Sequence, residues 1–158
     1  MSANDPQRDF LRHTIAALAY RASRVLLEAP DGFSTARASE STRTAGQILA
    51  HLGDLFEWAV HLANGEQVWN VRPPAEWSDD VVRFFQGLEQ LDAILASAKP
   101  LEFSPERLFQ GPIADALTHI GQMAMLRRIA GSPMLGENYY KAEITLGRVG
   151  ADQAEALL

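Results

Sequence analysis

Two histidines and one aspartate have the spacing needed to form a metal site in a helical protein. His51 lies three residues after Ile48 and four before Leu55, on the apolar face of its predicted helix. Asp115 lies four residues before His119, so these two side chains leave one face of a later helix one turn apart. Two histidines and one carboxylate are the donors of an open transition-metal site. A buried Asp–His hydrogen bond without a metal is the alternative, and the spacing alone does not separate the two.

Two further polar side chains lie close to these three along the chain. Gln122 follows His119 by three residues, and it could hydrogen-bond a ligand or a bound water. Asp54 follows His51 by three residues, and it could be a further ligand or hold a histidine tautomer. The alternatives are a polar residue at the helix rim for Gln122 and a solvated acid for Asp54.

The remaining histidines and the tyrosines near the C-terminal end suggest less specific roles. His13 and His61 lie off the apolar stripes, so we expect surface or helix-rim positions for them. Asn138, Tyr139 and Tyr140 form a polar and aromatic cluster that could line a substrate mouth. A loop folding over the core would use the same residue types.

Helical periodicity runs through most of the chain and predicts the elements that position these residues. Start and stop signals place four amphipathic helices at about 5–30, 44–65, 78–99 and 112–131. The second begins with a Thr44–Gln47 capping box. Ser104-Pro105-Glu106 predicts a short extra turn, and the fourth long helix begins near Pro112. Four helices of similar length predict an all-α fold, a four-helix bundle over about residues 5–131. We expect a single domain, 1–158, in which the C-terminal extension 132–158 packs across one end or face.

Composition narrows the range of functions. The 158 residues are 47% hydrophobic and carry a net charge of −6, which suits a folded domain and argues against a nucleic-acid partner. The absence of cysteine excludes disulfides and a cysteine nucleophile. No apolar run has the length of a membrane span, and the N-terminus lacks the pattern of a signal peptide. We therefore expect a cytoplasmic protein that has no membrane partner and acts on a small molecule.

Two segments resemble a known family. The segment from Thr44 to Leu52, with Phe56-Glu57-Trp58 after it, resembles the second helix of DinB/YfiT-like proteins, in which a histidine in that setting binds metal. His119-Ile120-Gly121-Gln122 resembles that family's His-Arg-Gly-Gln signature on the last helix. The resemblance implies an up-down-down-up bundle that holds a divalent metal on three ligands, here His51, Asp115 and His119.

The family also suggests an activity, and this chain departs from the family pattern at two positions. Some members are thiol S-transferases that use bacillithiol or mycothiol, so the resemblance implies a transferase with a low-molecular-weight thiol and a possible homodimer. Asp115 stands where the family usually has a histidine, and Ile120 stands where the signature has arginine. Asp115 keeps zinc, nickel, manganese or iron acceptable but makes the site less positive.

Two other functions stay open at this point. A site with two histidines and one carboxylate also suits a non-haem iron enzyme. The third possibility is a non-catalytic bundle that binds a metal or a small ligand, or that serves in dimerisation. Neither a phosphate-binding glycine loop nor a serine-hydrolase elbow is present in the sequence.

Overall fold

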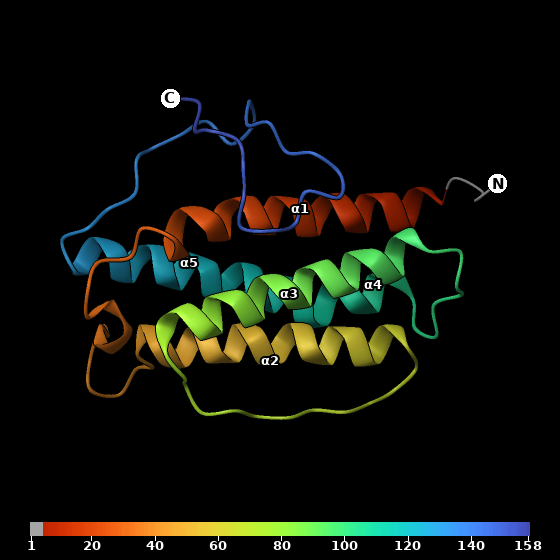
Figure 1. Ribbon diagram of the computed structural model, residues 1–158, viewed down its shortest axis with the longest axis horizontal. Coiled ribbons are helices and arrows are strands. Elements are labelled where there is room, and N and C mark those ends of the chain that lie inside the picture. Colours follow the sequence, from red (N-terminus) through yellow and green to blue (C-terminus); the bar gives the residue numbers. More distant parts are fainter. Residues whose placement is uncertain (1–4) are drawn as a thin grey trace.

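The protein is an all-α four-helix bundle, as the periodicity predicts (Figure 1). The computed structural model describes residues 5–158, and this part of the chain contains no strand. The four long helices are α1 (Pro6–Leu26), α2 (Ala45–Ala63), α3 (Trp77–Ala96) and α5 (Ala114–Ile129). In Figure 1, α1 and α5 run in one direction and α2 and α3 in the other, so the topology is up-down-down-up. This order requires a long crossover between α2 and α3, which residues 64–76 provide along the outside of the bundle.

Local signals at the first two helix starts act as predicted. The Asp5 carboxylate accepts hydrogen bonds from the backbone N–H groups of Gln7 and Arg8, which have no partners within the helix. The Thr44 side chain accepts from the N–H of Gln47, and the Gln47 side chain accepts from the N–H of Thr44. These caps fix where α1 and α2 begin, and the start of α2 sets the phase of His51.

The last bundle helix differs from its prediction in both length and geometry. Helix begins at Pro105 rather than near Pro112, with α4 (Pro105–Leu108), a π-helical segment η2 (Phe109–Ile113) and α5 following without a break. Pro112 lies inside the π segment, where the wider turn accommodates a residue that has no N–H to donate. The proline therefore marks a change of helical phase, two residues before α5 begins at Ala114, and not a helix start.

Three other boundaries move by a few residues. Glu76 rather than Ser78 precedes the first turn of α3, and that helix ends at Ala96, before the predicted stop at Lys99. The first helix ends at Leu26 and not at Pro30. A short 3-10 turn, η1 (Phe33–Thr35), follows in the loop that leads to α2. These shifts leave the inward faces of the helices unchanged.

The core consists of apolar side chains from all four long helices. Large side chains with less than 2% exposure come from each of them, including Leu18 of α1, Leu52 of α2 and Phe84 of α3. On the last helix the predicted inward residues Ile113, Ala116, Ile120 and Met123 are buried as well. Burial of this kind contributes about 1.5–3 kcal/mol for each large apolar side chain. The rigid core holds α2 against α5, where His51 and His119 reside.

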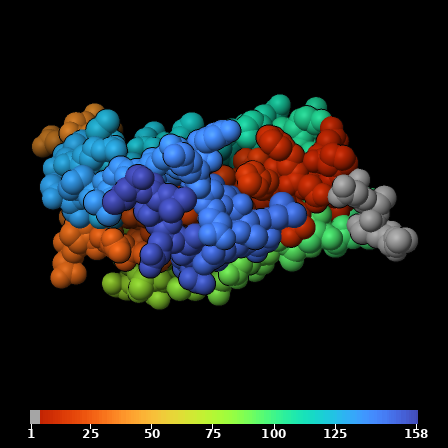
Figure 2. All heavy atoms as spheres, turned by 90° about the horizontal axis from the view of Figure 1, so that it is seen from above, coloured from red at the N-terminus to blue at the C-terminus, as the bar shows by residue number. Residues whose placement is uncertain are grey.

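The C-terminal segment, residues 132–158, lies across α1, and Figure 2 shows it from above. It contains turns and irregular backbone but no helix. Glu137 attaches it to α1, because its carboxylate, 2% exposed, accepts hydrogen bonds from Tyr20 and from Arg24, the latter at 3.2 Å. The expected packing across one face of the bundle is therefore observed.

Among residues 5–158, no helix combines the length and the apolar character needed to cross a membrane.

Candidate metal centre

His51 of α2 and His119 of α5 meet at the contact between the two helices. Their ring centroids are 4.7 Å apart, and the ring planes are nearly perpendicular at 86°. Asp115 Oδ2 lies 3.3 Å from His51 Nε2 and 3.4 Å from His119 Nε2. One donor atom of each residue lies within 4.8 Å of the others, so the three residues form a group that could hold a metal ion. We call these three residues the triad.

The spacing of the donor atoms is compatible with a shared metal, and the 3.3 Å contact between His51 Nε2 and Asp115 Oδ2 is also a hydrogen bond without one. In a tetrahedral zinc site, bonds of about 2.05 Å and angles near 109° place neighbouring donor atoms about 3.3 Å apart. The two distances from Asp115 Oδ2 therefore match the edges of a metal polyhedron, and two histidines with one carboxylate are a suitable donor set.

Gln122 orients His119 from the same helix. His119 Nδ1 lies 2.8 Å from Gln122 Oε1, so the protonated Nδ1 donates to this oxygen. Nε2 is then the unprotonated ring nitrogen, and it lies 3.4 Å from Asp115 Oδ2. A hydrogen bond to the far ring nitrogen is the usual way in which proteins fix the tautomer of a metal-binding histidine.

The environment of His51 favours the neutral imidazole that a metal requires. Burial is the largest effect and lowers its pKa, and the charges of His119 and Arg43 act in the same direction. Asp115 opposes them through a hydrogen bond and its negative charge, but the net pKa stays below the ordinary value of 6.5.

Asp115 is more exposed than a carboxylate in a bundle core would be. Its side chain is 46% exposed, whereas those of His51 and His119 are 18% and 12% exposed. The sequence analysis treated Asp115 as a core-facing carboxylate, and the structure corrects this. The triad lies at the edge of the bundle, with the histidines toward the core and the carboxylate toward solvent. Water and small molecules can therefore reach the donor atoms.

Trp69 covers one side of the triad, which the sequence analysis missed. Its ring lies 5.8 Å from that of His51 and 5.5 Å from that of Trp58, in both cases edge to face. Trp69 is 45% exposed and belongs to the crossover between α2 and α3. Helical periodicity cannot identify a functional residue in a loop. An aromatic side chain within a polar, proline-containing loop was a signal that could have indicated Trp69.

A cavity of about 660 Å³ lies beside His119. Its walls come from α2, α5 and the loop before α2; they are Ala38, Thr42, Arg43, Ile48, His119, Gly121, Gln122, Met125 and Leu126. The apolar members come mainly from the two helices, and Arg43 supplies a cation at the edge. The loop residues were not among the site residues expected from the sequence.

Asp54 has partners other than the triad. Its carboxylate, 2% exposed, accepts a hydrogen bond from Arg83 at 2.6 Å and another from the backbone N–H of Arg72 at 3.3 Å. Arg83 also contacts Glu57 at 3.1 Å. Asp54 is therefore neither a solvated acid nor placed as a ligand. It joins α2 to α3 and to the crossover through a buried ion pair.

The C-terminal tyrosines lie away from the triad. Tyr139 packs edge-on against Tyr20 of α1 and under the guanidinium of Arg21, while Tyr140 is 97% exposed. Asn138 accepts a hydrogen bond from the backbone N–H of Tyr140. None of the three lines the cavity beside His119, so the expected substrate mouth is not at this segment. The contacts of Tyr139 fit the alternative role, a loop packed over the bundle.

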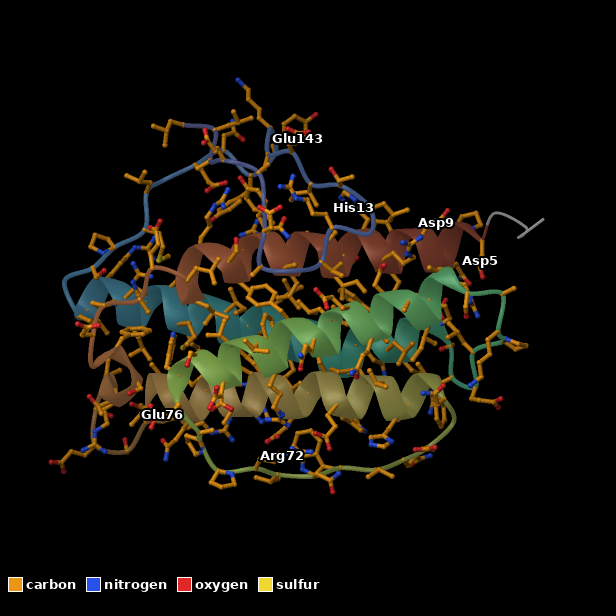
Figure 3. All side chains as sticks on the ribbon, in the orientation of Figure 1. Asp5, Asp9, His13, Arg72, Glu76 and Glu143 are labelled. Atoms are coloured by element: carbon orange, nitrogen blue, oxygen red, sulfur yellow. The ribbon has the colours of Figure 1, made fainter. Side chains whose placement is uncertain are left out.

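The other two histidines have surface settings, as expected. His13 is exposed on the outer side of α1 (Figure 3). His61 is partly exposed near the end of α2, and its Nδ1 lies 2.6 Å from the Glu66 carboxylate.

Fold and triad together define an up-down-down-up helical bundle with a possible metal site between α2 and α5. The chain matches no protein-family model, no curated protein and no solved structure. Functional inference therefore depends on the site itself.

Proposed function

We propose that the protein binds a divalent metal through His51, Asp115 and His119 and is a thiol S-transferase of the DinB/YfiT type. The observation that carries the proposal is the convergence of three donor atoms, with Asp115 Oδ2 3.3 Å and 3.4 Å from the two imidazole nitrogens. Three protein ligands leave a coordination position free, which is the arrangement of catalytic rather than structural sites.

The chain's own residues would act by binding and orientation. His51 and His119 would present Nε2 to the ion, and Gln122 would hold the His119 ring through Nδ1. Trp69 would limit access of water from the crossover side. When bound, the divalent ion would stabilise a low-molecular-weight thiol as its thiolate, which supplies the nucleophile that this cysteine-free chain lacks.

The reaction would form one sulfur–carbon bond. The thiol would give its proton to solvent, and its sulfur would attack an electrophilic carbon of the second substrate. The leaving group departs from that carbon with the bonding electron pair. No side chain has to form a covalent intermediate.

Metal binding is tested first. Protein purified without chelators or a histidine tag is analysed for bound metals and then titrated with Zn²⁺, Ni²⁺ and Mn²⁺ by calorimetry. We expect one ion per chain in the wild type and in His13→Ala, and a large loss of affinity in His119→Ala. Equal affinity in all three proteins would exclude the triad as the site.

Transfer is tested next, with the metal-loaded protein. Bacillithiol, mycothiol or glutathione is incubated with 1-chloro-2,4-dinitrobenzene, which releases chloride when the sulfur attacks the ring. We expect a rate that depends on the metal, is retained in His13→Ala and is lost in His119→Ala. If all three thiols react equally fast with wild type and His119→Ala, the transferase proposal fails while metal binding still stands.

The donor set also supports a second candidate function, iron-dependent oxygen chemistry, because two histidines and one carboxylate are the ligands of many non-haem iron sites. Oxygen uptake by the Fe²⁺-loaded protein that is absent from His119→Ala would favour this function over thiol transfer.

A further inference from the structure

The cavity beside His119 combines an apolar wall with one cation. Ile48 of α2 and Met125 and Leu126 of α5 line it with apolar side chains, and Arg43 and Thr42 are contributed by the loop before α2. A volume of about 660 Å³ is within the range of pockets that take small organic ligands, about 300–1,000 Å³. An apolar pocket with a few polar groups at its edge binds the body of a ligand by burial and orients it by its polar end.

Arg43 is the residue that gives the cavity its charge preference. Arg43 is exposed and forms no ion pair among residues 5–158, which is also true of Arg37, Arg107 and Arg128; among these arginines it is Arg43 that lines the cavity. A guanidinium presents paired N–H donors that fit both oxygens of a carboxylate. In a protein with a net charge of −6, an unpaired arginine at a cavity edge stands out as a site for an anion.

Gly121 leaves room on the α5 side of the cavity. A Cβ added at this position would meet no atom within 4 Å. Gly121 therefore has no side chain to fill the space next to the His119 imidazole. The open volume continues from the apolar wall up to His119, so a ligand in the cavity would place one end beside the triad.

We propose that the cavity binds the electrophilic substrate, and that this substrate has an apolar body and a carboxylate that pairs with Arg43. That this ligand is a substrate rests on the proposed function, because the transferase needs a second reactant next to the thiol. The apolar wall assigns the cavity to this reactant, since low-molecular-weight thiols such as glutathione are polar along most of their length.

The test uses 3-phenylpropionate as the probe and its uncharged amide as the comparison. Binding of each is measured by NMR titration of the full chain, once after dialysis against a chelator and once with Zn²⁺ added. We expect the carboxylate to bind about tenfold more tightly than the amide, as a hydrogen-bonded charge pair provides. Resonances of Gly121 and Met125 should shift during the titration.

Two variants with matched controls assign the contacts. Arg43→Gln should remove the preference for the carboxylate, whereas Arg37→Gln, the same change on the same loop, should keep it. Gly121→Leu should abolish binding of both probes by filling the cavity, while Gly121→Ala should retain most of it. Both changes at Gly121 raise helix propensity, so the fold should be preserved.

Several outcomes would overturn the proposal. They are equal affinity for the two probes, an unchanged preference in Arg43→Gln, or undiminished binding in Gly121→Leu. Binding of glutathione that depends on Arg43, without such dependence for 3-phenylpropionate, would assign the anion to the thiol and also overturn it. Zn²⁺ affinity is measured in parallel: a chain that binds 3-phenylpropionate through Arg43 but binds no metal would refute the proposed function and leave the cavity assignment in place.

Discussion

Asp115 and His119 lie one helical turn apart on α5, with Asp115 Oδ2 3.4 Å from His119 Nε2. The carboxylate is thereby directed along the helix toward the imidazole, and it reaches His51 on the neighbouring helix at 3.3 Å. A single side chain thus joins both histidines. Because Asp115 is 46% exposed, it can be changed without opening the core, which makes it the most informative position for mutation.

Asp115→Ala should weaken metal binding without unfolding the protein. The two histidines remain but lose the third donor and its negative charge, so Zn²⁺ affinity should fall by at least about tenfold. Asp115→His restores three nitrogen donors, and its affinity should equal or exceed that of the wild type. Calorimetric titration measures both, with Asp79→Ala, a change at an exposed acid of α3, as the control. Wild-type affinity in both Asp115 variants would show that this residue is not a ligand.

Gln122 should matter for metal affinity although it is not expected to touch the metal. Gln122→Ala removes the acceptor at 2.8 Å from His119 Nδ1, and loss of such a partner typically costs about 10–100-fold in affinity or activity. Gln122→Glu keeps an acceptor oxygen and should retain binding. Thr118→Ala, one turn earlier on the exposed side of α5, is the control. If Gln122→Ala binds Zn²⁺ like the control, the His119 ring is held by packing alone.

The four helices and the inward faces that carry His51 and His119 were predictable because they depend on local, periodic signals. The up-down-down-up order was an expectation from the family resemblance. The Thr44–Gln47 capping box and the stripe through Ile48 and Leu55 set the face on which His51 lies. The same reasoning applies to Asp115 and His119, since a spacing of four residues has a fixed meaning on a helix.

Other features have no such local signal. Pro112 normally indicates a helix start or break, but here a π-helical segment accommodates it within a continuous helix. The partner of Asp54 is Arg83, 29 residues later, and the contact of Trp69 with His51 depends on how the crossover folds back. Such contacts are decided by tertiary packing, which sequence spacing does not encode.

The attachment of the C-terminal segment to α1 should depend on Glu137. Glu137→Gln leaves Arg24 without its acidic partner at a site where the carboxylate is 2% exposed, so we expect a loss of about 3 kcal/mol in the free energy of unfolding. Release of residues 132–158 should also make them more sensitive to limited proteolysis. Glu143→Gln, which changes an exposed acid of the same segment, should behave like the wild type (Figure 3). Identical denaturation and proteolysis in both variants would show that the apolar contacts of the segment suffice.

Glu57 should make the stability of the protein depend on pH in the acidic range. Burial alone would raise its pKa, but hydrogen bonds from Asn70 and Arg83 and the charge of Arg72 outweigh burial, so the pKa lies below its ordinary value of 4.5. A carboxyl group whose pKa is lowered by folding stabilises the folded state above the ordinary pKa, and this contribution disappears as the pH falls through the lower, folded-state value.

Glu57→Gln should therefore be less stable than the wild type at neutral pH, by up to about 1 kcal/mol for a partly exposed ion pair. The difference should shrink as the pH is lowered below 4.5 and vanish once Glu57 is protonated in both states. Urea denaturation of both proteins across this pH range measures it, with Glu89→Gln, at an exposed acid of α3, as the control. Since the two proteins differ only at residue 57, the other carboxylates contribute equally to the pH dependence of stability in both. A difference that stays constant with pH would mean that the glutamine disturbs packing. The charge of Glu57 would then contribute nothing to the stability of the contacts between α2, α3 and the crossover.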